Sequence, residues 1–341
     1  MRRNTAFGNG LISAWQTVNA KRFLTISCEL ASALIGPGEM AEFVLGCVQL
    51  GLAYGAANRT GKPCHSEALR LLERAVAGGI HSFDVARGYG DAEDRLGQAL
   101  ANCSVTIITK LSALSQVPLE AKADTVVMAV EESIRASCEA LRRNRLDCVL
   151  LHRAAHRTMW GGAVWQRLLR YRDDGTIGRL GVSVQSPQEA KDALTDRDVQ
   201  HLQFPFNLLD KRWERVLSRT ILFPNLTVHV RSVFLQGLLA ANDPSLWPAI
   251  ESVDAVALLT TINGLVREME RDSAADLCVA YARGQLGVSG LVIGLETEAQ
   301  LGANLALFQR PPLSLDQCRR VEAALPPCSE QLLNPALWPK A

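Results

Sequence analysis

The feature that most constrains this sequence is an alternation of short apolar runs and amphipathic segments from residue 43 to residue 308. The apolar runs have the length of buried strands, and the segments between them repeat apolar residues with the period of a helix. Eight such strand–helix units with short connections predict an α/β fold, a closed parallel (β/α)8 TIM barrel rather than an open doubly wound sheet. The predicted strands are 43–48, 80–83, 105–109, 147–151, 177–184, 199–204, 226–230 and 290–293. The predicted helices are 66–77, 91–101, 123–142, 163–173, 187–194, 210–218, 263–283 and 297–308.

Other parts of the chain are expected to lie outside this repeat. Residues 1–39 are predicted to be a poorly ordered N-terminal extension, because their basic residues and apolar stretch are spaced badly for a signal peptide. Met40 is then a candidate for the natural start of the protein. Residues 40–325 should form the barrel together with an extra C-terminal helix at 314–325. Residues 326–341 are predicted to be a peripheral C-terminal tail.

The composition excludes several classes of function. A net charge of +1 over 341 residues gives no basic excess for a nucleic-acid or anionic-membrane partner. No apolar run reaches the length of about 20 residues that a transmembrane helix needs. Nine cysteines without a C-x-x-C pair indicate reduced thiols rather than a disulfide framework. We therefore expect a cytoplasmic protein, and the sequence leaves its oligomeric state open.

Three consecutive predicted strands end in side chains that can carry acid–base chemistry. Asp84 ends the second strand, and Tyr89 follows it in a loop between two glycines. Lys110 ends the third strand, and His152 comes directly after the fourth. Because active sites of (β/α)8 barrels form at the carboxyl ends of the strands, we expect these four side chains to share one cavity.

The four side chains complement one another chemically. A free phenol titrates near pH 10, so Tyr89 needs assistance to donate a proton at neutral pH. Lys110 can stabilise the phenolate with its charge, Asp84 can hold the lysine in place, and His152 can hydrogen-bond a carbonyl oxygen. Each residue taken singly has an ordinary structural role in a loop, a cap or a core. Together they predict proton donation to a carbonyl, and they contain no metal site.

The sequence resembles the aldo-keto reductase family over roughly residues 43–310. The segments that carry the resemblance, in the order of the family, are 83–90 with 93–97, 109–110, 150–152, 177–183 and 203–207. The resemblance implies an NAD(P)-dependent carbonyl reductase or alcohol dehydrogenase. In that family Tyr89 would be the general acid/base, Lys110 and Asp84 would tune it, and His152 would orient the substrate.

The resemblance also implies a set of cofactor-binding residues. Ser183 and Gln203 match positions that hold the nicotinamide carboxamide, although Val184 stands where the family usually has Asn. Arg231 replaces an aromatic residue that stacks on the nicotinamide; a guanidinium can stack as well, and a salt bridge is the open alternative. The other implied positions are Ser232, Phe234 and Gly237 at the pyrophosphate, and Gly294, Gln300 and Asn304 at the adenosine end.

Two acidic residues bear on the choice of cofactor. Relatives that prefer NADPH carry Lys or Arg near positions 296–298, where this chain has Glu296 and Glu298. Because a carboxylate repels a 2′-phosphate, we expect NADH to be accepted at least as well as NADPH. The alternative is that these residues only complement the dipole of the helix that follows.

The expected substrate is a small or sugar-like aldehyde or ketone, interconverted with its alcohol. A second reading is a cofactor-binding sensor or interaction subunit on the same barrel with little turnover, which a Tyr89→Phe comparison would distinguish. A third is a lyase or aldolase that forms a Schiff base on Lys110. Dependence on a nicotinamide cofactor would exclude that third function.

Overall fold

A computed structural model describes residues 40–339, and in it eight parallel strands close into a barrel in the order of the sequence. β1 pairs with β2 on one side and with β8 on the other, so the sheet has no free edge. The strands are β1 (Glu42–Gly46), β2 (Ser82–Asp84), β3 (Thr106–Lys110), β4 (Leu146–Leu151), β5 (Ile177–Ser183), β6 (His201–Pro205), β7 (Thr227–Arg231) and β8 (Gly290–Gly294). The predicted (β/α)8 barrel is confirmed. The expected extension at 1–39 lies outside the described residues.

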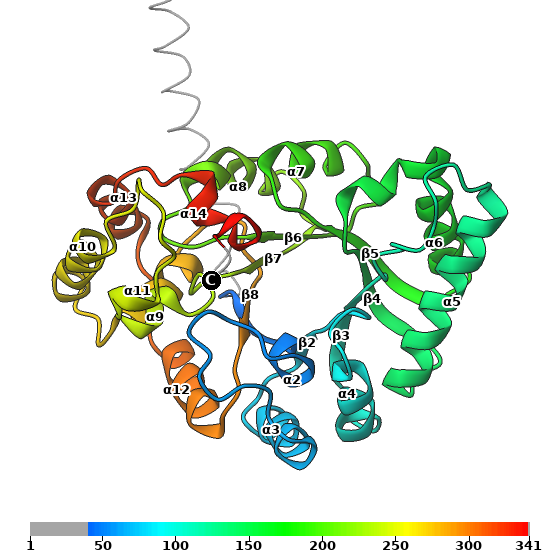
Figure 1. Cartoon of the computed structure of the whole chain (residues 1–341), viewed down its shortest axis with the longest axis horizontal. Helices are drawn as coiled ribbons and strands as arrows, with labels where there is room; N and C mark the ends of the chain where they lie inside the picture. The colour runs from blue at the N-terminus through cyan, green and yellow to red at the C-terminus, as the bar shows by residue number, and fades with distance from the viewer. Residues whose placement is uncertain (1–39, 340–341) are drawn as a thin grey trace, which may run out of the picture. The chain divides into compact units, whose positions relative to one another are not determined.

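Helices surround the barrel (Figure 1). They are α2 (Val48–Gly51), α3 (His65–Ala77), α4 (Ala92–Leu100), α5 (Ala123–Leu141), α6 (Ala163–Asp173), α7 (Pro187–Ala193), α8 (Glu214–Thr220), α9 (Leu238–Ala241), α10 (Ala255–Glu268), α11 (Ala274–Arg283), α12 (Glu298–Gln309), α13 (Leu315–Ala324) and α14 (Glu330–Leu333). The extra C-terminal helix expected at 314–325 is α13. Between residues 40 and 339, no helix has the length and apolar sequence needed to cross a membrane.

The single helix predicted over 263–283 was wrong, because the structure has two helices there. α10 begins earlier than expected, at Ala255, where the Asp254 carboxylate accepts a hydrogen bond from the backbone of Ala257 at 2.9 Å. Glu270 adopts a left-handed backbone with φ of 54°. Ser273 then caps α11 by accepting from the backbone N–H of Asp276 at 3.1 Å. The cap and the left-handed residue break what looked like one continuous apolar period.

The inside of the barrel combines a small apolar layer with two histidines. Val44, Ile108, Cys148 and Leu150 form the apolar layer. His201 on β6 and His229 on β7 are both 2% exposed, and their rings meet edge to face with centroids 4.3 Å apart. A Cβ atom added to Gly290 would lie 2.9 Å from both the His229 ring and the Val44 side chain, so this glycine makes room for both.

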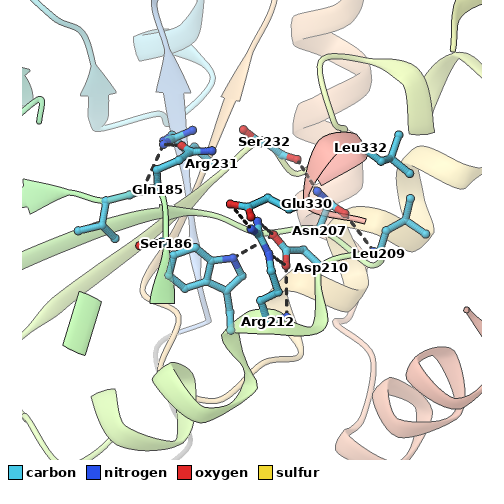
Figure 2. Close-up of polar contacts among 12 residues, drawn as sticks. Gln185, Ser186, Asn207, Leu209, Asp210, Arg212, Arg231, Ser232, Glu330 and Leu332 are labelled. Atoms are coloured by element: carbon cyan, nitrogen blue, oxygen red, sulfur yellow. Dashed lines mark hydrogen bonds and ion pairs between the residues drawn. The ribbon is translucent and has the colours of Figure 1, made fainter. Parts of the chain in front are cut away.

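The tail after α13 packs against the barrel through a short helix, α14. Leu332 and Leu333 of this helix are 1% and 2% exposed. Arg212 connects the tail to the loop after β6, because its guanidinium bonds the Asp210 carboxylate at 2.7 Å and lies 3.6 Å from Glu330 (Figure 2). The division of the chain at residues 40 and 325 stays a prediction.

Candidate active site

The centre of the candidate site is a buried ion pair at the ends of β2 and β3. Lys110 Nζ lies 2.5 Å from Asp84 Oδ1 and donates a second hydrogen bond to the carbonyl of Val85 at 2.9 Å. The side chains of the two paired residues are 1% and 5% exposed. The second carboxylate oxygen of Asp84 accepts from Gln203 Nε2 at 2.7 Å. Both oxygens of the buried carboxylate are therefore satisfied, which burial of an ion pair requires.

Tyr89 and His152 lie beside this pair. Lys110 Nζ is 5.1 Å from the centroid of the Tyr89 ring. The ring of His152, which follows β4, meets the Tyr89 ring edge to face with centroids 5.8 Å apart. The structure thus brings all four predicted catalytic residues together, and Tyr89 and His152 stay partly exposed while Asp84 and Lys110 are buried.

Burial and charge set the protonation states in this site. Burial by itself lowers the pKa of Lys110, but the adjacent Asp84 carboxylate and the Tyr89 hydroxyl outweigh it, and the net shift of this pKa is upward. Burial, followed by the charge of Lys110, lowers the pKa of His152 to about 4. At neutral pH the site therefore holds an ammonium at Lys110 and a neutral imidazole at His152.

The loop that carries Tyr89 is fixed by close backbone packing against α2. A Cβ atom at Gly51 would lie 1.8 Å from the carbonyl oxygen of Tyr89, and one at Gly90 would lie 2.5 Å from the carbonyl oxygen of Gly51. Gly90 also has φ of 57°, which favours glycine. The two glycines let the loop approach α2 closely enough to set the position of Tyr89.

Glu93 anchors the same loop from the other side, a role that its place in the segment 93–97 did not reveal. Its carboxylate is buried, accepts from Thr109 Oγ1 at 2.6 Å and Ser137 Oγ at 2.9 Å, and pairs with Arg87 at 2.5 Å. Thr109 immediately precedes Lys110 on β3. Glu93 therefore ties the loop of Tyr89 to the strand of Lys110.

Two of the predicted cofactor residues are connected to the ion pair. Gln203 on β6 is fully buried, and besides donating to Asp84 it accepts from Ser183 Oγ at 3.4 Å. Val184, the departure from the family pattern, is buried and donates its backbone N–H to the Gln203 carbonyl at 2.8 Å. Ser183 and Gln203 are thus placed at the strand ends beside the catalytic residues, with their side chains bonded to each other.

Arg231 ends β7 next to these residues. Its Nη2 donates to Gln185 Oε1 at 2.8 Å and to the carbonyl of Val184 at 3.3 Å, as Figure 2 shows for the first bond. In the described part of the chain no ion pair of Arg231 is found. The geometry accordingly gives no support to the salt-bridge alternative among these residues.

The loop after β7 is tightly turned. Ser232, Leu235 and Gln236 have φ values of 61°, 46° and 55°, and Gly237 has 92°. The N–H groups of Leu235 and Gly237 donate within the loop, to the carbonyls of Ser232 and Phe234, both at 2.9 Å. Strained positions of this kind gather at functional sites, and contact of this loop with a pyrophosphate stays a prediction.

The residues predicted to contact the adenosine lie on β8 and α12, separate from the Lys110–Asp84 ion pair. Gln300 is exposed, and its Oε1 accepts from the backbone of Glu296 and Thr297 at the start of α12. Asn304 is 9% exposed, and its amide has no side-chain hydrogen bond to other described residues. The contact of Asn304 with an adenine stays a prediction. Gly294 makes room for the side chain of Gln49, which would collide with a Cβ atom there.

Two arginines that sequence reasoning missed stand beside the acidic start of α12. Arg74 and Arg70, both on α3, form ion pairs with Glu298. These partners are separated by more than two hundred residues, so no local pattern signals the contact. Glu298 is therefore partly neutralised, whereas Glu296 has its pKa raised by burial.

Comparison with known proteins bears on the family and the fold. Residues 43–326 match the family model of the aldo/keto reductase family. Among solved structures, the chain is similar to an aldo-keto reductase from Bacillus halodurans in its holo form, with 19% identity, 86% of this chain and 96% of that chain covered, and a TM-score of 0.69. It is also similar to the glycerol dehydrogenase of Gluconobacter oxydans, with 17% identity, 84% and 91% covered, and a TM-score of 0.64. No curated protein sequence matches. The match over most of the barrel shows that this chain belongs to the aldo/keto reductase family.

Proposed function

We propose that this protein is an NAD(P)-dependent oxidoreductase that interconverts a small or sugar-like aldehyde or ketone and its alcohol. The observation that carries the proposal is the buried ammonium of Lys110, which lies between the Asp84 carboxylate and the ring of Tyr89. The family and the structural neighbours support an oxidoreductase.

In this proposal Tyr89 donates the proton to the carbonyl oxygen during reduction. The charge of Lys110 stabilises the phenolate that remains, and Asp84 keeps Lys110 charged and in place despite its burial. His152, which is neutral because its pKa is lowered to about 4, donates a hydrogen bond that holds the carbonyl oxygen near Tyr89. In the alcohol-oxidising direction the same groups accept the proton.

The bound nicotinamide would supply or accept the hydride. Its carboxamide would be held by Ser183 and Gln203, its pyrophosphate by the loop Ser232–Gly237, and its adenosine by the start of α12. Gln203 would have to exchange one of its present hydrogen bonds for the carboxamide, since its amide already bonds Asp84 and Ser183.

For the choice of cofactor, we propose that NADH is accepted at least as well as NADPH. Glu296 and Glu298 support this, and Arg70 and Arg74 offset part of the negative charge by pairing with Glu298. A parallel titration with both reduced nucleotides checks the proposal. Binding of NADPH tenfold or more tightly than NADH would contradict it.

We also propose that the protein works in the cytoplasm on a small molecule, without a nucleic-acid or membrane partner. The near-neutral charge of +1 supports this, because it gives no electrostatic attraction to a polyanion. The test is a comparison of binding to an anionic vesicle and to duplex DNA with binding to the reduced nucleotides.

The function is tested by a steady-state screen of aldehydes, ketones and sugars with both reduced nucleotides. Tyr89→Phe should lower kcat by about a hundredfold or more, since general acid catalysis contributes factors of about 10² to 10⁴. Tyr171→Phe is the matched control, because Tyr171 is a partly exposed tyrosine on α6 whose ring lies 4.0 Å from the guanidinium of Arg167 and which contributes to none of the proposed site. Wild-type rates in Tyr89→Phe would refute Tyr89 as the proton donor. Tight nucleotide binding with negligible turnover in both proteins would favour a sensor instead.

A further inference from the structure

A cleft lies among the outer helices of the barrel, where α13 packs beside α8 and α11 (Figure 1). It has a volume of about 260 Å³, and none of the predicted catalytic or cofactor-binding residues lines it. Pockets for drug-sized ligands begin at roughly 300 Å³, so this cleft has room for a small metabolite. The side chains that define it include Phe206, Asp210, Lys211, Glu214, Tyr281 and Glu322.

Two carboxylates of this cleft have no cation as a partner. Glu322 of α13 accepts hydrogen bonds at Oε1 from the Tyr281 hydroxyl at 2.9 Å and from Gln285 Nε2 at 3.4 Å. Between residues 40 and 339, neither Glu322 nor Glu214 of α8 forms an ion pair. The pKa of the buried Tyr281 is raised by its burial and then by the charges of Glu322 and Glu214, so both carboxylates lie near this phenol.

The loop after β6 contributes a third carboxylate and a cation to the cleft. The oxygens of Asp210 already accept hydrogen bonds from Arg212 and from the indole of Trp213, so this carboxylate is not available to a ligand (Figure 2). Lys211 Nζ donates to the carbonyl of Leu325 at 2.6 Å. In the described part of the chain this ammonium has no other acceptor, which leaves two of its three donors for a ligand.

We propose that this cleft binds a free amino acid with an apolar side chain. The ammonium of the ligand would bond the carboxylates of Glu214 and Glu322, and its carboxylate would bond Lys211. Arg319 also lines the cleft, so the lining offers charges of both signs, as a zwitterion requires. A ligand with one charge would leave groups of the lining desolvated without a partner, which costs free energy. The apolar side chains that would contact the ligand are Leu217, Ile221, Leu286 and Leu315.

The cleft is a binding site additional to the proposed catalytic site, although the two share the loop after β6. In that loop the backbone N–H of Phe206 donates to the carbonyl of Arg231 at 2.8 Å. Asn207 Nδ2 donates to the carbonyl of Ser232 at 3.4 Å. The inference itself does not depend on the reaction that the barrel catalyses.

The test is calorimetric titration of the full chain with L-valine, L-leucine and L-phenylalanine. Two analogues of leucine each keep one charge: 3-methylbutylamine has the ammonium and 4-methylpentanoate has the carboxylate. Each analogue should bind about tenfold or more weakly than leucine, because it lacks one set of charged hydrogen bonds. A preference for either analogue over leucine would overturn the assignment of a zwitterion.

Variants of the lining locate the binding. Glu322→Gln and Lys211→Gln should each weaken leucine about tenfold, since each removes one charge that bonds the ligand. The amide of Glu322→Gln can still accept from the Tyr281 hydroxyl, so the packing of α13 on α11 is kept. Glu139→Gln, on the exposed face of α5, is the matched control and should leave the affinity unchanged.

The remaining outcomes separate this inference from the proposed function. Failure of all three amino acids to bind the wild type would overturn the inference, and so would equal affinity in the wild type and both variants of the cleft. Leucine should bind equally well in the presence of saturating NADH. Displacement by NADH would place leucine at the mouth of the barrel and would also overturn the inference. Failure of NADH itself to bind would count against the proposed function alone, because the cleft variants test the inference without it.

Discussion

At the scale of single residues, Asp84 is the side chain on which the other catalytic groups depend. Its two oxygens bond Lys110 and Gln203, which come from two other strands. A lysine that is 1% exposed keeps its proton only because this carboxylate compensates for the cost of burial. The presence of the Asp84 carboxylate therefore decides whether Tyr89 has an ammonium or an uncharged amine beside it.

Replacing Asp84 with Asn should make the activity sensitive to alkaline pH. Without the carboxylate, burial dominates and lowers the pKa of Lys110, so the ammonium is lost at a lower pH than in the wild type. The variant should therefore lose kcat progressively as the pH rises, by about tenfold or more. In the wild type the pKa of Lys110 is raised above 10.5, so this loss is not expected.

The pH profile of kcat for the two proteins is the measurement. Asp174→Asn, at an exposed turn after α6, controls for the substitution itself. Parallel profiles for Asp84→Asn and the wild type would show that Lys110 keeps its proton without Asp84.

The sequence was sufficient to select four candidate catalytic residues that the structure brings together, because each has a fixed place relative to a strand end. Asp84 and Lys110 are the last residues of β2 and β3, so the closure of the barrel alone brings them together. The second contact of Asp84 could not be predicted, because Gln203 lies 119 residues further along the chain and its rotamer depends on packing. The pairing of Glu298 with Arg70 and Arg74 was missed for the same reason.

At the scale of elements, the loop between β2 and α4 is the part that presents Tyr89. It is held by the close approach of Gly51 and Gly90 and by the buried carboxylate of Glu93. Glu93 bonds groups of the loop, of β3 and of α5 at once. Because three elements share one carboxylate, loss of that carboxylate should affect stability and catalysis together.

Glu93→Ala should lower the free energy of unfolding by about 3 kcal/mol, since it leaves Arg87 and two buried hydroxyls without their partner. Glu93→Gln should recover part of the loss, because an amide oxygen can still accept from Thr109 and Ser137. The measurement is denaturant unfolding, with kcat followed in parallel. Glu139→Ala, which removes an exposed ion-pair partner of Arg135, should leave the unfolding curve unchanged. Unfolding of Glu93→Ala at the wild-type midpoint would contradict a stabilising role.

The elements show where local patterns are reliable and where they fail. Strands and helices bounded by glycines or caps were predicted to within a few residues, as for α6, found at 163–173 as expected. The error at 263–283 arose because Ser273 caps a helix from within a run of helix-compatible residues. A cap is decided by the backbone conformation of one residue, which an apolar period does not report.

At the scale of the whole molecule, the barrel interior is filled partly by two buried histidines, His201 and His229. Burial, followed by the neighbouring His229, lowers the pKa of His201 well below 6.5. Lys110 and Arg179 add positive charge around it, and its Nδ1 lies 3.5 Å from the Cys148 thiol. The folded barrel therefore favours the neutral form of His201.

Acid should consequently destabilise the fold through His201. At a pH between the lowered pKa of His201 in the folded protein and the ordinary value near 6.5, the unfolded chain binds one more proton than the folded chain. The stability contributed by neutral His201 is therefore fully present above about pH 6.5 and decreases as the pH falls. The expected contribution is about 1.4 kcal/mol per pH unit below that value. His201→Gln should remove this part of the pH dependence. The free energy of unfolding of the wild type and of His201→Gln, measured at about pH 7 and about pH 5, gives the two slopes.

The exposed histidine His65 provides the matched control, because His65→Gln changes a side chain on the outer surface of α3. It should leave the slope between the two pH values as in the wild type. If His201→Gln kept the full wild-type slope, the acid sensitivity would have to come from another group.

The space beside Gly290 on β8 is filled by side chains of neighbouring strands. Because a methyl group there would meet the ring of His229 on β7 and a methyl group of Val44 on β1 at 2.9 Å, the three strands share one volume inside the barrel. Changing Gly290 to Ala first would overpack this volume, whereas a smaller side chain at position 229 first leaves only a cavity, which the added methyl group can then fill. The order in which mutations arise thus matters here, and a descendant of this barrel could exchange its histidine for a larger β8 side chain by one route and not by the other.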